Sequence, residues 1–346
     1  MALGWGVLGA GGIADRRMIP EGLVPSDMCR LEMVMDASPE RAEAVGRKHG
    51  VPYTSSVEEI LANPAVDVVY IATPTFVHKE QAIAAAQAGK HVLVEKPLGL
   101  NLAEGQAVLD ACDAAGVKCA SGYLMRFHGA HLEVRRLIEA GELGEITFGR
   151  AQLTCWYPDM PGAWRQEWRL GGGGALVDMG THCLDLLEWL IAPIDRVAAL
   201  SDTLTFDYEV EDSATVLVHF ANGAHGVVDA NFNVPDDAAQ NVLEIRGTKG
   251  AIYADHTIGQ DAGGTLRVYV PGGVAGYNAA QVREGQDIGV TVPFERINMY
   301  RAEAEAFVRA IESGSEPPVS GRVGLRALEI TLRAYEAARQ GRFLAV

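Results

Sequence analysis

The chain has 346 residues, 48% of them hydrophobic and 21% charged, which predicts two globular domains and excludes wholesale disorder. The formal net charge of −16 disfavours nucleic acid and anionic membrane surfaces as partners. Five cysteines without CxxC spacing disfavour a disulfide scaffold or a structural zinc site, and neither a signal peptide nor a membrane-spanning run is predicted, so we expect a cytoplasmic protein with reduced thiols.

The first third of the chain alternates strand-like and helix-like segments. Apolar runs predict strands at 5–8, 31–35, 66–72, 91–94 and 117–121, and the segments between them predict helices at about 12–23, 38–48, 78–88 and 102–115. Ser38 and Pro39 are typical of a helix start, and Gly89 and Gly116 of helix ends. This alternation predicts a parallel sheet with right-handed crossovers.

The pattern changes after about residue 123. Helices are predicted at about 130–140, 177–191, 298–313 and 322–340, and strands at 146–156, 196–204, 214–220, 226–233, 241–246 and 251–254. Short turns between successive strands predict an antiparallel or mixed sheet. The glycine-rich stretch 259–289 is predicted to be mostly loop.

A glycine-rich turn follows the first predicted strand. Gly9-Ala10-Gly11-Gly12-Ile13-Ala14 fits the pattern G-x-G-x-x-A, in which the glycines allow a tight turn and a close approach of backbone to a pyrophosphate. Asp36 ends the second strand, where a carboxylate can bind the ribose hydroxyls of NAD and repel the 2′-phosphate of NADP. Ser38 and Arg41 lie close enough to weaken that preference, so NAD is predicted, with NADP as the alternative. An ordinary glycine turn is the competing interpretation.

Polar residues also follow the next two strands of the predicted sheet. Thr73-Pro74-Thr75 follows one strand and Glu95-Lys96-Pro97 follows the other. Since parallel strands end at one edge of a sheet, these residues should meet the glycine turn there. Lys96 is held extended by the proline after it, although a solvated loop lysine is equally compatible with the pattern.

A second group of polar residues lies in Gly171-Gly172-Gly173-Gly174-Ala175-Leu176-Val177-Asp178-Met179-Gly180-Thr181-His182. The glycines should let the backbone pass close to a ligand or a neighbouring element. Asp178 and His182 are four residues apart on a predicted helix and so share a face, where a carboxylate can set the tautomer and basicity of an imidazole. A structural hydrogen-bonded pair is the alternative. A metal site is not predicted, because no third ligand is evident.

These motifs together resemble those of the glucose–fructose oxidoreductase/inositol dehydrogenase/MocA family. The most specific element is Ala88-Gly89-Lys90-His91-Val92-Leu93-Val94-Glu95-Lys96-Pro97, and Gly122, Arg126 and Phe127 with 141–144 resemble the family's domain junction. The resemblance covers essentially the whole chain. It implies an α/β fold with an N-terminal Rossmann parallel sheet over 1–123 and an α+β domain with a large, mostly antiparallel sheet over 124–346. The last helices could pack back on the first domain.

The resemblance also implies an activity and roles for individual residues. Family members exchange a hydride between nicotinamide and a sugar or cyclitol hydroxyl. Lys96 would therefore hold the substrate hydroxyl and assist proton transfer, His182 would be the general base in oxidation, and Asp178 would orient the substrate and the histidine. The cofactor contacts implied beyond the glycine turn are Thr73, Pro74, His78, Glu95 and Lys96, with Arg126, Trp164 and Arg165 as pocket or cofactor contacts. A homo-dimer or homo-tetramer is implied, built through the sheet of the second domain.

Two other functions remain open from the sequence. One is an enzyme of the dihydrodiol dehydrogenase type, and the other is a non-catalytic protein that senses dinucleotides on the same scaffold. The joint presence of Lys96, Asp178 and His182 favours an enzyme.

Overall fold

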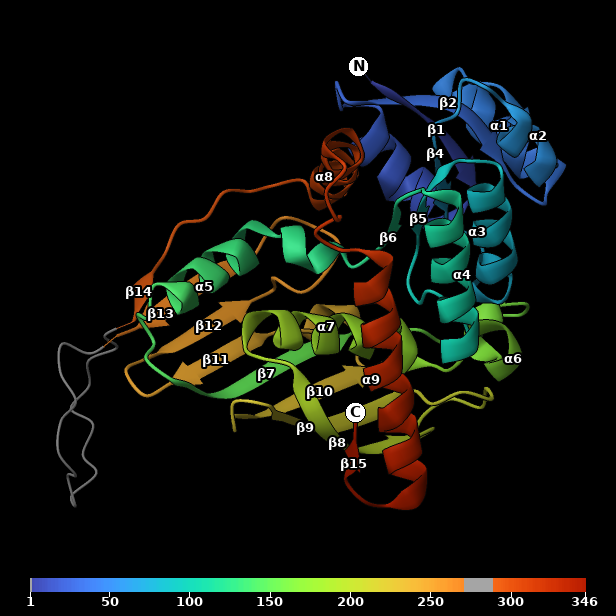
Figure 1. The fold of residues 1–346 in the computed structure, drawn as a ribbon. Coiled ribbons are helices and arrows are strands. Elements are labelled where there is room, and N and C mark those ends of the chain that lie inside the picture. The colour runs from blue at the N-terminus through green and yellow to red at the C-terminus, as the bar shows by residue number, and fades with distance from the viewer. Residues whose placement is uncertain (1, 271–288) are drawn as a thin grey trace, which may run out of the picture.

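The computed structural model describes residues 2–270 and 289–346, and two sheets organise them (Figure 1). The first sheet has six strands in the order β3-β2-β1-β4-β5-β6, all parallel, which confirms the predicted Rossmann sheet. Its strands are β1 (Leu3–Leu8), β2 (Cys29–Met35), β3 (Tyr53–Thr54), β4 (Val68–Ile71), β5 (His91–Val94) and β6 (Cys119–Ser121).

Both faces of this sheet are covered by helices. The helices of this part are η1 (Ala14–Leu23), α1 (Pro39–His49), α2 (Val57–Ala62), η2 (Thr75–Val77), α3 (His78–Gln87) and α4 (Leu102–Ala115). Along β4, Val68 and Tyr70 belong to the core that includes η1, whereas Val69 and Ile71 belong to the core that includes α3 and α4. Burial on both faces explains why this strand carries no charged residue.

Two short elements of the first part of the chain, one strand and one helix, were not predicted. β3 has two residues and α2 has six, which is too short for an apolar repeat to be recognised. The first helix was predicted from about residue 12, and the chain is helical from there, with η1 over Ala14–Leu23. Gly12, at the first of these positions, has a φ of +54°, a backbone conformation that favours glycine.

The second sheet has nine strands in the order β14-β13-β12-β11-β7-β10-β9-β8-β15. β7 and β10 pair in parallel and the other neighbours pair antiparallel, which confirms the mostly antiparallel sheet. The strands are β7 (Ile146–Thr154), β8 (Ile194–Asp202), β9 (Ser213–Phe220), β10 (His225–Asn231), β11 (Leu243–Gly247), β12 (Ala251–Asp255), β13 (Thr265–Tyr269), β14 (Val290–Thr291) and β15 (Leu344–Ala345).

The predicted loop over 259–289 was partly wrong. β13 lies inside it and pairs with β12 along five residues. Glycines lie on both sides of this short strand, and because glycines are typical of loops, the sequence pattern here indicates a loop. The part of that prediction over 271–288 lies outside the described residues.

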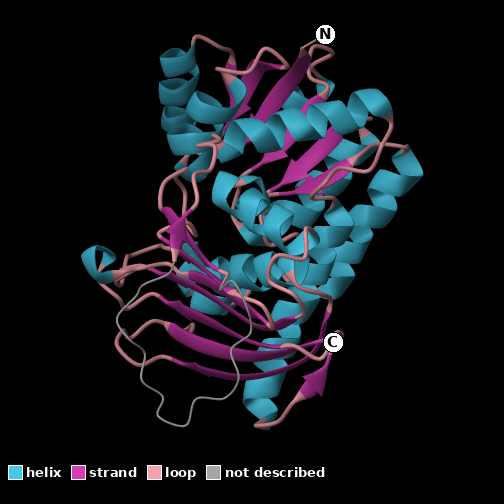
Figure 2. Ribbon diagram, turned by 90° about the vertical axis from the view of Figure 1, so that its left-hand side faces the viewer, coloured by secondary structure: helices cyan, strands magenta, loops and turns pink. Residues whose placement is uncertain are grey.

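The helical segments of the second part differ in length, and the long ones lie mainly on the side of its sheet that faces the first sheet (Figure 2). They are η3 (Leu124–Phe127), α5 (Gly129–Glu139), η4 (Trp164–Gln166), α6 (Trp168–Gly171), η5 (Leu176–Gly180), α7 (Thr181–Leu190), η6 (Asp236–Ala238), α8 (Met299–Ser313) and α9 (Gly321–Gln340). α9 packs on β8 and α7 and also reaches α4 and β6, while α8 packs on η1. The two C-terminal helices therefore join the two sheets.

The helix predicted over 177–191 is present as one continuous helical stretch with a wide first part. Leu176–Gly180 forms a wide π-type turn, and the regular helix α7 begins at Thr181. Such turns are frequent at functional sites. All five cysteines are free, and within the described ranges no helix combines the length and apolar character needed to cross a membrane.

Candidate active site

The ends of four parallel strands lie side by side and carry the predicted site residues. In the sheet register Leu8 pairs with Met35 and with Ile71, and Ile71 pairs with Val94. The glycine turn, Asp36, the Thr73-Pro74 segment and Glu95-Lys96 follow these aligned ends directly. The predicted convergence at one sheet edge is therefore present in the fold.

The glycine turn is shaped by its close approach to the next strand end. Gly9 has a φ of +83°, and a Cβ there would lie 2.7 Å from the Thr73 backbone nitrogen. At Gly12, in contrast, an added Cβ would meet nothing within 4 Å. The turn is therefore tightly packed at Gly9 and has free space at Gly12, just before η1. A bound pyrophosphate requires such free space beside the start of the helix.

Asp36 is buried at the tip of β2 and is tied to the glycine turn. Its Oδ2 accepts a hydrogen bond from the Gly11 nitrogen at 3.2 Å, and its Oδ1 accepts from the Ser38 nitrogen at 2.9 Å and from Arg41 at 3.3 Å. A carboxylate oxygen can accept two hydrogen bonds, so Oδ2 can still accept one from a ribose hydroxyl. These residues therefore fit a dinucleotide.

Arg41 covers the outer side of the same turn. A Cβ on Gly11 would lie 2.8 Å from Arg41 Cδ, and the arginine side chain remains 59% exposed. The Ser38 side chain accepts from the Arg41 nitrogen and so caps α1. A cationic group beside Asp36 is the feature that would tolerate a 2′-phosphate.

Lys96 and Asp178 form an ion pair between the two parts of the molecule. Lys96 Nζ lies 2.7 Å from Asp178 Oδ1 and also donates to the Asp178 backbone carbonyl. Arg165 Nε lies 3.4 Å from the same carboxylate oxygen. Burial alone would raise the pKa of Asp178, but the two cations hold it below its ordinary value.

His182 lies one turn beyond Asp178, in the first turn of α7, and is buried. Burial, together with the positive charge of Lys96, lowers the pKa of His182 to about 3, so the imidazole is neutral. Its Nδ1 has no hydrogen-bond partner among the described residues, and Asp178 bonds to Lys96 and Arg165 instead. The role of Asp178 in orienting the imidazole therefore stays a prediction, since the structure shows its carboxylate bound to Lys96 and Arg165.

Glu95, directly after β5, is bound by a tyrosine of the core that includes η1. Tyr70 donates its hydroxyl to Glu95 Oε1 at 2.5 Å, and burial raises the pKa of Glu95. Thr73 donates its hydroxyl to Gln81 at 2.6 Å. Pro74 lies directly after Thr73 and precedes η2.

His78 was predicted to contact the cofactor, but both of its ring nitrogens face the protein backbone. Nδ1 lies 2.9 Å from the Pro97 carbonyl and Nε2 lies 2.9 Å from the Thr73 carbonyl, and the ring is buried. His78 thus holds the two strand-end loops together and presents no ring nitrogen to a ligand.

Arg126 and Trp164 have different surroundings. Arg126 makes two hydrogen bonds with the buried Asp185, at 2.9 and 2.6 Å, which occupies its Nε and one terminal nitrogen. Trp164 lies under the Arg165 guanidinium, with Cζ 4.2 Å from the ring centroid. Because Arg165 also contacts Asp178, Trp164 and Arg165 lie together beside this carboxylate.

Several residues around the helix start were not predicted from the sequence. Tyr123 lies edge-on to His182 with ring centroids 5.6 Å apart, and its hydroxyl lies 2.9 Å from Thr181 Oγ1. Glu211 and Tyr335 contact the glycine run before Asp178. Tyr335 lies on the last helix, and no local pattern indicates that it reaches this site.

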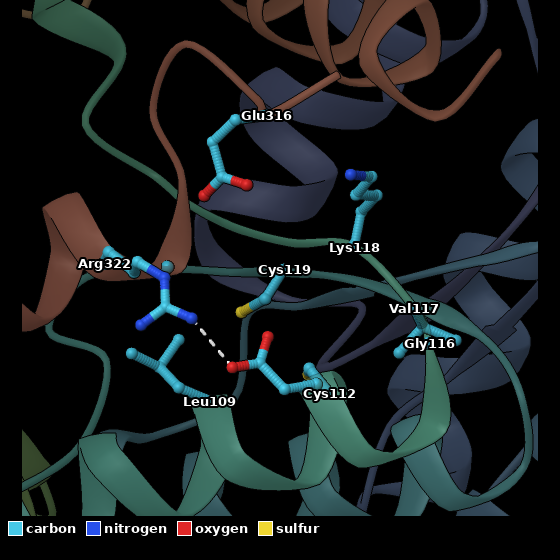
Figure 3. Close-up of a pocket in the computed structure, with 10 residues that line it drawn as sticks. Leu109, Cys112, Gly116, Val117, Lys118, Cys119, Glu316 and Arg322 are labelled. Carbon is cyan, nitrogen blue, oxygen red and sulfur yellow. Dashed lines mark hydrogen bonds and ion pairs between the residues drawn. The ribbon is translucent and has the colours of Figure 1, made fainter. Parts of the chain in front are cut away.

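A separate cavity of about 230 Å³ lies between α4, β6 and the start of α9 (Figure 3). Cys112, Cys119 and Lys118 line it, and Arg322 pairs with Asp113 at its rim at 2.7 Å. The predicted site residues do not line this cavity. Within residues 2–270 and 289–346, no group of three or more His, Cys, Asp or Glu side chains is placed to hold a metal ion.

Comparison with protein families gives two matches that follow the two sheets. Residues 3–123 match the model described as the oxidoreductase family, NAD-binding Rossmann fold, and residues 131–253 match the GFO/IDH/MocA C-terminal domain. Together these matches extend from β1 to β12.

Characterised proteins match along nearly the whole chain. The chain is 30% identical over 344 residues to 1,5-anhydro-D-fructose reductase of Ensifer adhaerens, covering 97% of this chain and 96% of that protein. It is 29% identical over 338 residues to D-xylose 1-dehydrogenase (NADP(+)) 2 of Haloferax volcanii, covering 97% and 98%. Other relatives are named for inositols and for a dihydrobenzenediol. The solved complex of levoglucosan dehydrogenase with NADH and levoglucosan has a TM-score of 0.86 at 26% identity, covering 100% of both chains.

Proposed function

The chain belongs to the GFO/IDH/MocA family of NAD-binding oxidoreductases, and from this we propose that it oxidises a secondary hydroxyl of a sugar, anhydro sugar or cyclitol, or reduces the matching ketone, with nicotinamide C4 exchanging the hydride. The observation that carries the proposal is the ion pair of Lys96 with Asp178, at 2.7 Å. It joins the strand edge that carries the dinucleotide turn to the helix start that carries His182.

The dinucleotide would be held by the residues that follow the aligned strand ends. Gly9, Gly11 and Gly12, with Ile13 before η1, would face the phosphates, and Asp36 would accept from the ribose hydroxyls. We propose NAD as the preferred form because the carboxylate of Asp36 is buried next to the turn. Arg41 offers the charge that NADP would need.

Lys96 would bind the oxygen that changes between hydroxyl and carbonyl. Asp178 holds the ammonium group of Lys96 through both a carboxylate and a carbonyl oxygen, which fixes its direction. A positioned cation stabilises negative charge that develops on an oxygen in the transition state. Lys96 would therefore favour loss of the hydroxyl proton during oxidation and polarise the carbonyl during reduction.

His182 would take up the proton in oxidation and return it in reduction. It is neutral because burial and Lys96 lower its pKa to about 3, and Nδ1 has no protein partner in the described chain. A neutral imidazole with an unpaired nitrogen can accept a proton from a hydroxyl within hydrogen-bond reach. The proton then remains on the protein or passes to solvent, which completes the loss of one hydride and one proton from the substrate.

A substrate panel tests the proposed function. Purified protein is incubated with NAD or NADP and myo-inositol, scyllo-inositol, D-xylose, levoglucosan or trans-1,2-dihydrobenzene-1,2-diol, and with 1,5-anhydro-D-fructose and the reduced cofactor. We expect turnover with at least one sugar, anhydro sugar or inositol. Turnover of the dihydrodiol alone would establish the alternative substrate class. Tight NADH binding with no turnover in either direction would establish the sensing function and refute the enzyme assignment.

We also propose that the second sheet forms the contact between subunits of a homo-dimer or homo-tetramer. Leu200 and Leu217 project from neighbouring strands of this sheet and are 71% and 47% exposed. Exposed leucines on a strand surface favour burial against another chain. Light scattering coupled to size exclusion measures the mass, and a monomer at micromolar concentration would refute the proposal. We further propose that the boundary between the dinucleotide-binding domain and the second domain lies after residue 123.

A further inference from the structure

The start of η5, which leads to Asp178 and His182, is held mainly by one carboxylate. Glu211 precedes β9, and its Oε2 accepts from the Gly174 nitrogen at 2.9 Å while its Oε1 accepts from the Leu176 nitrogen at 2.8 Å. The backbone carbonyl of the same residue accepts from the Ala175 nitrogen at 3.1 Å. Three consecutive amide groups at a helix start, which lack partners within the helix, are thus bound by a single residue.

Tyr335 on α9 completes this arrangement. Its hydroxyl donates to Glu211 Oε1 at 2.7 Å and accepts from the Val177 nitrogen at 3.2 Å. Both Glu211 and Tyr335 are buried, and Trp168 packs edge-on against the tyrosine ring with centroids 5.1 Å apart. Two residues that are 124 positions apart therefore satisfy the amides from Gly174 to Val177.

The contacts explain why glycines lie before the helix. A Cβ on Gly173 would lie 2.1 Å from the Tyr335 hydroxyl, and one on Gly174 would lie 2.0 Å from the Glu211 carbonyl. Gly173 also has a φ of +146°. The glycine run therefore allows close contact with a neighbouring pair of side chains, which was one of the two alternatives that the sequence left open.

The held segment ends at the proposed catalytic group. The Asp178 nitrogen donates to the Gly174 carbonyl at 3.0 Å, and both the carbonyl and the carboxylate of Asp178 bind Lys96. We propose that Glu211 and Tyr335 are positioning residues, which fix the helix start so that Asp178 holds Lys96 and His182 stays shielded from water. This inference rests on the function proposed above for Lys96, Asp178 and His182.

Tyr335→Phe is the sharpest variant, because it removes the hydroxyl and keeps the ring against Trp168. Tyr300→Phe is the matched control, since the Tyr300 hydroxyl is equally buried but has no hydrogen-bond partner among the described residues. Glu211→Gln is a second variant, in which an amide group would face a backbone N–H. Thermal unfolding identifies any variant that does not fold, and Tyr335→Phe alone then decides the outcome.

Two kinds of measurement separate positioning from general stability. The first is kcat and KM for the best substrate among myo-inositol, D-xylose and levoglucosan, together with the Kd for NADH. The second is the protonation of His182 by ¹⁵N NMR of histidine-labelled protein, assigned with His182→Gln. We expect Tyr335→Phe to lower kcat about tenfold with the Kd for NADH within about twofold of wild type, and His182 to titrate in the ordinary range of histidine.

Other results would overturn the inference. One is a Tyr335→Phe protein whose kcat and His182 titration both match those of Tyr300→Phe. Another is a loss of NADH affinity as large as the loss of kcat, because the effect would then extend beyond the helix start. If the wild-type protein turns over none of the three substrates, the proposed function is refuted for those substrates. The titration of His182 would still decide whether Glu211 and Tyr335 shield this residue.

Discussion

Lys96 Nζ lies 2.7 Å from Asp178 Oδ1, although the two residues are 82 positions apart and belong to different sheets. The ion pair connects the end of β5 in the dinucleotide-binding sheet to the wide turn before α7. Each group therefore depends on the other for its orientation.

Lys96→Ala should abolish turnover while NADH still binds. Removal of a positioned group that stabilises charge on the reacting oxygen costs about a hundred- to a thousandfold in kcat. The glycine turn and Asp36 do not contact Lys96, so the Kd for NADH should change little. Lys249→Ala, at an exposed turn between β11 and β12, is the control. A near-normal catalytic rate in Lys96→Ala would remove the role assigned to this lysine.

Asp36→Ala should raise the KM for NAD more than the KM for NADP. A hydrogen bond to a charged group contributes about 1.5–3 kcal/mol, which corresponds to at least about a tenfold change for NAD. Arg41→Ala is the reciprocal variant and should weaken NADP more than NAD, because Arg41 lies over the same turn. The two Michaelis constants of each variant are compared by steady-state kinetics. Equal effects on both cofactors would refute the assignment of Asp36 to the ribose.

The stability of the protein should fall as the pH is lowered through the ordinary pKa of histidine. His182 has an unfolded pKa of 6.5 and a folded pKa of about 3. Between these values the unfolded chain binds a proton that the folded chain does not, so the contribution is complete above 6.5 and is lost as the pH falls. The slope is up to about 1.4 kcal/mol per pH unit for this group. Thermal unfolding at several pH values measures it.

His182→Gln is the comparison for that measurement. The variant should unfold with a shallower dependence on pH, because one buried neutral histidine has been removed. His131, whose pKa burial also lowers to about 3, remains in both proteins and sustains part of the slope. Identical slopes in wild type and His182→Gln would contradict the low pKa of His182.

Arg126→Met should destabilise the fold by about 3–5 kcal/mol, because it leaves the buried Asp185 carboxylate without its partner. The double variant Arg126→Met/Asp185→Leu should recover most of that free energy of unfolding, since both charges are then absent. Chemical denaturation measures both changes. A single variant as stable as wild type would contradict the buried ion pair. If the stable double variant binds NADH more weakly than wild type does, Arg126 contributes to cofactor binding.

Local patterns in the sequence were sufficient for the dinucleotide edge. Gly9, Asp36 and Lys96 each follow a strand whose apolar run is recognisable by itself, and parallel strands end at one edge whatever the remaining packing. The four-residue spacing of Asp178 and His182 likewise places them on one helical segment. For this reason the Rossmann sheet could be predicted before any coordinates, while the mostly antiparallel second sheet and the family were implied by the resemblance of the motifs.

The tertiary structure alone decided which side chains meet. Arg126 pairs with the carboxylate of Asp185. His78 turns both ring nitrogens to backbone carbonyls, and Asp178 bonds to Lys96 and not to His182 Nδ1. Strands as short as β3 have no apolar period to detect. Contacts such as Glu211 with Tyr335 join segments over a hundred residues apart. Local periodicity determines secondary structure, but the partner of a buried charge is set by packing, which no short stretch of sequence contains.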